Sequence, residues 1–183
     1  MRSARGACKI VKKQRLLLVD GYNVLNAWKG ILSGRSLADA RDQLVARLHD
    51  YAGTTGQKVI VVFDAWQSDR PMRSIEENGQ ITVVFTQQKE TADHYIERVC
   101  DELSERVRAG HTILRVATSD GVEQTIIMGR GAQRVSAREL LYELEGARGA
   151  RKALSQPGKK KSSLMDRLPE DVRQKLEQMR RGE

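Results

Sequence analysis

Short, nearly continuous apolar runs rich in valine and isoleucine alternate along this chain with longer segments whose apolar residues recur at helical spacing. Such runs predict strands of a parallel sheet buried on both faces, because a strand with one solvated face would alternate apolar and polar residues. The predicted strands are 16–20, 59–64, 81–85, 112–118 and a shorter one at 133–135. The predicted helices are 37–51, 92–107, 122–128 and one that opens at 136.

Capping signals support two of these helices. Ser36 with Asp39 and Ser136 with Glu139 have the spacing of a capping box, which satisfies backbone N–H groups at a helix start. The first of these helices is expected to end before Gly53, since glycine is a common helix terminator. Together, the strand and helix signals predict that strands and helices alternate along the chain.

Alternating strands and helices predict an α/β fold, a three-layer sandwich with a mostly parallel central sheet of about five strands. We expect the domain to span 15–146, preceded by a basic arm, 1–14. A Gly, Ser and Lys-rich segment, 147–163, is predicted to be a flexible basic linker. An amphipathic helix is predicted at 164–183, and the sequence leaves open whether it packs on the domain or docks on a partner.

The formal net charge of +8 is unevenly divided. Residues 1–15 carry six Lys/Arg and no acid, and residues 146–183 carry eleven against five, which leaves fifteen basic and nineteen acidic residues between them. Basic ends suit a polyanion, because each phosphate that Lys or Arg neutralises releases condensed counterions. The alternative is that both ends are simply solvated.

Other classes of protein lack their signatures here. No run of about 18 apolar residues could span a membrane and the basic N-terminus lacks a secretory apolar stretch, so we expect a cytoplasmic protein with no membrane contact. The patterns GxxxxGKS/T and GxSxG are absent, as is GxGxxG after the first strand. We therefore expect neither a nucleotide cofactor nor an α/β-hydrolase site.

Aspartates stand where three predicted strands end, at Asp20, Asp64 and Asp120. Open α/β sheets bind ligands at this edge, where the strand order reverses. Glu90 and Asp93 lie at the predicted start of a helix near the same edge. Gathered carboxylates repel one another unless a cation intervenes, and Mg²⁺ or Mn²⁺ is the ion that carboxylate oxygen favours. Any one of these aspartates could instead only cap a turn or helix.

The four blocks Asp20-Gly21-Tyr22-Asn23, Asp64, Glu90-Thr91-Ala92-Asp93 and Thr118-Ser119-Asp120-Gly121 resemble, in order and spacing, the NYN domains of the PIN-like nuclease superfamily. Within these they are similar to the YacP-type bacterial branch. The resemblance implies a PIN-like Rossmannoid fold whose acidic site residues are Asp20, Asp64, Glu90, Asp93 and Asp120, with Asn23 helping to arrange the first. It also implies an endoribonuclease that cleaves mRNA in association with the ribosome.

We expect Asp20, Asp93 and Asp120 to form the main metal shell, with Asp64 and Glu90 completing it or holding waters. Activated water and charge stabilisation at the phosphodiester would then need no side-chain nucleophile. Possible RNA contacts near this site are Tyr22, Trp28, Arg70, Arg73 and Lys89. An equal alternative for Trp28 is that it packs under the first helix. For Arg70, Arg73 and Lys89 the alternative is that they are solvated.

Two other functions stay open at this point. The chain could be an RNA- or ribosome-binding module with a vestigial acidic site, although the intact acidic positions argue against that. It could also be a PIN-like nuclease directed at DNA, which would normally need an added helical clamp that the sequence does not contain.

Overall fold

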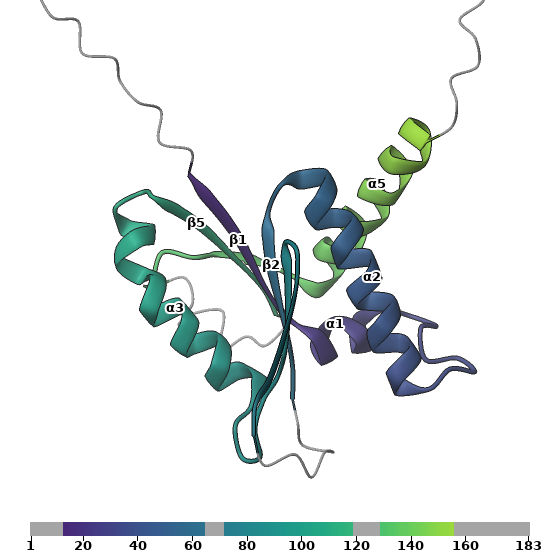
Figure 1. Cartoon of the computed structure of the whole chain (residues 1–183), viewed down its shortest axis with the longest axis horizontal. Helices are drawn as coiled ribbons and strands as arrows, with labels where there is room; N and C mark the ends of the chain where they lie inside the picture. The colour runs from purple at the N-terminus through teal and green to yellow at the C-terminus, as the bar shows by residue number, and fades with distance from the viewer. Residues whose placement is uncertain (1–12, 65–71, 119–128, 156–183) are drawn as a thin grey trace, which may run out of the picture. The chain divides into compact units, whose positions relative to one another are not determined.

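The computed structural model describes residues 13–64, 72–118 and 129–155. They form one six-stranded sheet with the strand order β3-β4-β2-β1-β5-β6, flanked by helices (Figure 1). The elements are β1 (Gln14–Asp20), α1 (Gly21–Ala27), α2 (Leu37–Thr55), β2 (Lys58–Phe63), β3 (Ser74–Asn78), β4 (Ile81–Phe85), α3 (Ala92–Arg108), β5 (Thr112–Ala117), β6 (Gln133–Val135) and α5 (Ala137–Ser155). All strand pairs are parallel except β3 with β4, so the predicted α/β fold is confirmed.

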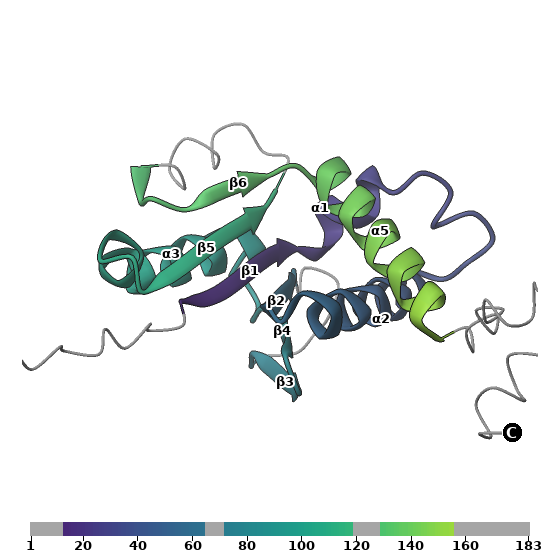
Figure 2. The same cartoon turned by 90° about the horizontal axis from the view of Figure 1, so that it is seen from above.

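Strand β1 shows why the sheet is buried on both faces. Leu17 and Val19 pack into one core with α1, α2 and α5, whereas Leu16 and Leu18 pack into a second core with α3. Successive side chains of a strand point to opposite faces, so an unbroken apolar run is what a covered sheet requires. Figure 2 shows α3 on one side of the sheet and α2 with α5 on the other.

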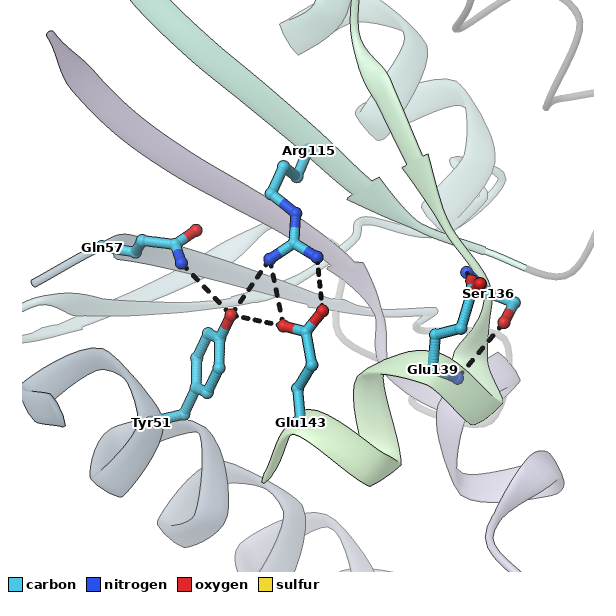
Figure 3. Close-up of polar contacts among 6 residues, drawn as sticks. All are labelled: Tyr51, Gln57, Arg115, Ser136, Glu139 and Glu143. Carbon is cyan, nitrogen blue, oxygen red and sulfur yellow. Dashed lines mark hydrogen bonds and ion pairs between the residues drawn. The ribbon is translucent and has the colours of Figure 1, made fainter. Parts of the chain in front are cut away.

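Polar contacts join α2, β5 and α5 over the first core (Figure 3). The Tyr51 hydroxyl donates to Oε2 of Glu143 at 2.6 Å and accepts from Nε2 of Gln57 at 3.2 Å. Arg115 donates from Nη2 to Oε1 of Glu143 at 2.6 Å and from Nη1 to the Tyr51 oxygen at 3.0 Å. Helix α5 is therefore held on the sheet by a bidentate ion pair in addition to its apolar side chains.

Several elements differ from their prediction. Helix α2 continues through the exposed Gly53 and ends where Gly56 adopts a left-handed conformation, with φ of 67°. Strand β3 was not predicted, because it is an edge strand with exposed, acidic residues and no apolar run. Helix α1 is only seven residues long and was also missed.

The boundary after the domain also differs. Helix α5 continues to Ser155, so the segment predicted to be a flexible linker from 147 is helical over its first residues. By its contacts the chain divides between Arg148 and Gly149. The predicted helix 122–128 and the terminal helix 164–183 lie outside the described residues. In the described part of the chain, no helix is long and apolar enough to cross a membrane.

Candidate active site

A pocket of about 550 Å³ lies at the carboxyl edge of the sheet, where β1 and β2 end. Strand order reverses at β1, whose two neighbours are β2 and β5, and this is the place where open α/β sheets bind ligands. The pocket is lined by Asp20, Tyr22, Asn23, Asn26, Leu37, Asp64, Thr91, Ala92 and Asp93. The structure thus brings together three of the five predicted acidic residues, and Tyr22 and Asn23 with them.

Asp20 is the most buried acid of the pocket, with 9% of its surface exposed. It ends β1 and caps α1, because its Oδ1 accepts the backbone N–H of Asn23 at 3.0 Å. Burial raises the pKa of Asp20 to about 6, and the negative charges of Asp93 and Asp64 raise it further against the backbone hydrogen bonds. Asp93 and Asp64 are therefore close enough to Asp20 to repel its negative charge.

Gly21 allows the end of β1 to pack closely against the end of β2. A Cβ atom at this position would lie 2.3 Å from Cε1 of Phe63, the residue before Asp64. Tyr22 packs edge-on against the Phe63 ring at 5.4 Å, and Phe63 stacks on Phe85 at 5.5 Å. Gly21 follows Asp20, and Phe63 precedes Asp64. A glycine is thus needed at position 21 so that these two neighbours of the acids can pack against each other.

The third acid is placed by the start of α3. The Thr91 hydroxyl accepts the backbone N–H of His94 at 3.2 Å, which makes Thr91 the N-cap and puts Asp93 in the first turn. A carboxylate there is stabilised by the helix dipole, whose positive end lies at the N-terminus. The strand-end and helix-start aspartates therefore line one pocket from separate parts of the fold.

Glu90, the other predicted acid that the structure describes, is placed differently. It precedes the helix, does not line the pocket and is held by two arginines. Arg73 donates from Nη2 to Oε1 at 2.5 Å and from Nε to Oε2 at 3.2 Å, and Arg98 donates from Nη1 to Oε1 at 2.8 Å. Burial alone would raise the pKa of Glu90, but these hydrogen bonds outweigh it and the pKa is lowered.

The predicted metal shell is only partly described. Asp120 lies outside the described residues, as does Arg70. Over 13–64, 72–118 and 129–155, no set of three His, Cys, Asp or Glu residues is grouped closely enough to hold a metal ion. Asp20 and Asp93 are the two predicted metal ligands that the pocket contains.

The other predicted RNA contacts lie in different surroundings. Trp28 packs against the first core, and the Arg47 guanidinium lies 4.7 Å from its ring centroid, which fits the packing alternative. Lys89 is exposed and has a φ of 70°.

Sequence reasoning missed Asn26 and Thr91 in the pocket. The first follows Asn23 by one helical turn, a signal that only a predicted α1 could have revealed.

The sequence matches the YacP-like NYN domain over residues 17–181, and the chain belongs to that family. It is 39% identical over 175 residues to YacP of Bacillus subtilis (strain 168), covering 92% of this chain and 98% of that protein. The crystal structure of Rae1 (YacP) from Bacillus subtilis is similar, with a TM-score of 0.63 and 36% identity over 91% of this chain and 95% of that one. A mutant of Rae1 gives a TM-score of 0.61 and 37% identity, covering 88% and 98%. The predicted family is confirmed.

Proposed function

We propose that this protein is a metal-dependent endoribonuclease that hydrolyses RNA phosphodiester bonds. The observation that carries the proposal is that Asp20, Asp64 and Asp93 line one pocket, where burial and the charges of Asp93 and Asp64 raise the pKa of Asp20. Capping explains one carboxylate at a time, but it does not explain why three elements present carboxylates to the same space. Perturbed acids in a cleft are typical of functional sites.

The donor set fits Mg²⁺ or Mn²⁺, because these ions prefer carboxylate oxygen and would offset the mutual repulsion of the acids. Asp20 and Asp93 would hold the ion together with Asp120, and Asp64 would complete the shell or hold a water. Such an ion supplies an activated water and stabilises charge that develops on the phosphodiester. The chain's own part is to keep Asp20 fixed, through the backbone N–H of Asn23.

The proposed substrate is mRNA, and the proposed setting is the ribosome in the cytoplasm. Support comes from the basic ends of the chain around a mildly acidic body and from the resemblance of its motifs to ribosome-associated endoribonucleases. The proposal includes Tyr22 as an RNA contact, since this aromatic residue lines the acidic pocket and could stack an unpaired base.

The test compares Asp20→Asn and Asp93→Asn with Asp42→Asn, which changes an exposed acid of α2. Purified protein with Mn²⁺ is given single-stranded RNA, matched DNA and translating ribosomes, and cleavage sites are mapped. We expect RNA cleavage that EDTA and both pocket substitutions abolish, whereas Asp42→Asn leaves it unchanged. Full activity in both pocket variants would overturn the assignment. Binding without cleavage of any substrate would favour an RNA-binding module instead.

A further inference from the structure

A compact charge cluster, formed by Arg73, Glu90, Tyr95 and Arg98, lies beside the pocket and is not part of it. Its acid lies deeper than either arginine, because the side chain of Glu90 is 9% exposed against 29% for Arg73 and 43% for Arg98. One carboxylate thus holds two guanidinium groups together. The cluster carries a net charge of +1 on its outer side, next to a pocket lined by acids.

Tyr95 makes this arrangement stiffer. The guanidinium carbons of Arg73 and Arg98 lie 5.0 and 4.9 Å from its ring centroid. A guanidinium carries five N–H donors, and Glu90 engages two nitrogens of Arg73 and one of Arg98. Both arginines therefore keep donors for a second oxyanion. Because they are already ordered, binding would cost less side-chain entropy than it would for free arginines.

The cluster lies at the same sheet edge as the acids. Arg73 directly precedes Ser74, which pairs with Phe85 at the carboxyl end of β4, and Glu90 directly precedes the N-cap of α3. A short connection joins the end of β4 at Phe85 to the start of α3 at Ala92. Strand β4 neighbours β2, and neighbouring strands lie about 4.8 Å apart. A strand of RNA crossing the pocket in that direction would next meet the arginines.

We propose that Arg73 and Arg98 bind a phosphate that flanks the scissile one, and that Glu90 is a positioning residue for them rather than a metal ligand. The identity of the polyanion as RNA rests on the proposed function. A polyanion in the acidic pocket is repelled by Asp20, Asp64 and Asp93, and a fixed pair of guanidinium groups offsets that repulsion where the chain leaves the pocket.

Binding is measured separately from cleavage, in an Asp20→Asn background, by anisotropy of a short labelled single-stranded RNA. We expect the double substitution Arg73→Gln/Arg98→Gln to raise Kd at least about tenfold. The slope of log Kd against log salt should fall by about 0.7 for the lost phosphate. Arg106→Gln is the control for the single variants Arg73→Gln and Arg98→Gln, because each of the three removes one positive charge. Arg106 lies in α3 and bonds Gln14 at the opposite edge of the sheet. If Arg106→Gln raises Kd as much as Arg73→Gln or Arg98→Gln alone, the proposal is overturned.

Glu90→Gln separates a positioning role from the alternatives. It removes a negative charge beside a polyanion, so simple electrostatics predicts tighter binding, whereas loss of the positioned arginines predicts a Kd raised several-fold. In the otherwise native chain we expect a raised KM with kcat little changed. A lost kcat with unchanged Kd would make Glu90 a member of the acidic site and overturn the proposal. If the native chain cleaves no RNA but the arginine effects on Kd persist, the proposed function fails and the binding element stands.

Discussion

Replacing Asp20 by asparagine is expected to stabilise the protein at neutral pH, although it removes the central residue of the site. Asp20 is buried, and its described contacts are backbone N–H groups and the repelling charges of Asp93 and Asp64. Asparagine keeps the cap, because its side-chain oxygen can accept the N–H of Asn23 as well as aspartate does. The substitution therefore removes the charge and little else.

The size of the effect follows from the pKa of Asp20, which burial and the neighbouring acids raise from 3.8 to about 6. Between these pH values the folded chain holds a proton that the unfolded chain has lost, so the free energy of unfolding falls as pH rises. The loss is complete above about pH 6. One pKa unit corresponds to 1.36 kcal/mol, so the charge of Asp20 costs about 3 kcal/mol at pH 8.

The assay is urea unfolding of both proteins in EDTA at a series of pH values, because their difference isolates Asp20 from other titrating groups. We expect equal free energies of unfolding below about pH 4 and a gap that grows to about 3 kcal/mol, in favour of Asp20→Asn, above pH 6. Asp42→Asn, an exposed control, should show no such gap. A gap absent at pH 8, or of opposite sign, would refute the burial and repulsion of Asp20.

Three further changes test the packing that positions the site. Gly21→Ala places a Cβ against the Phe63 ring and should cost about 1–3 kcal/mol in urea unfolding; adding Phe63→Leu should recover part of that loss, and a neutral single variant would contradict the close approach. Glu143→Gln weakens the ion pair with Arg115 and should cost about 1–3 kcal/mol, seen as a lower Tm. Ser36→Ala removes the cap of α2 and should cost about 1 kcal/mol, whereas Ser36→Asp should cost much less.

Strands β1, β2 and β4 were predictable because they are buried on both faces, which leaves an unbroken apolar run in the sequence. The same physics explains the misses. Strand β3 has no buried face and holds its place by pairing with β4, so Ser74–Asn78 carries no such run. Gly53 was an ambiguous stop, since an exposed helix interior tolerates glycine, and only the left-handed Gly56 marks the true end of α2.

The site was predictable to the extent that its residues are placed by the sheet. Asp20 ends β1 and Asp64 follows β2, and the carboxyl ends of parallel strands lie at one edge of the sheet whatever the loops do. Glu90 was also predicted in the acidic cluster, and spacing alone cannot tell a metal ligand from an ion-pair partner. Its partners are Arg73, from before β3, and Arg98, two turns into α3, and neither contact is local in sequence.

The two acids Asp20 and Glu90 show how the fold divides charge along its carboxyl edge. Two guanidinium groups compensate Glu90, and its pKa is lowered, whereas the neighbours described for Asp20 include two further acids and its pKa is raised. A buried acid whose negative charge is repelled by neighbouring acids is stabilised by a bound proton or a cation. Arg73 and Arg98 are held by Glu90 instead, beyond the end of β4 and two strands from β1. Under the proposed function this division is useful, because an arginine in the pocket would compete with the metal ion, whereas one beside it binds the substrate.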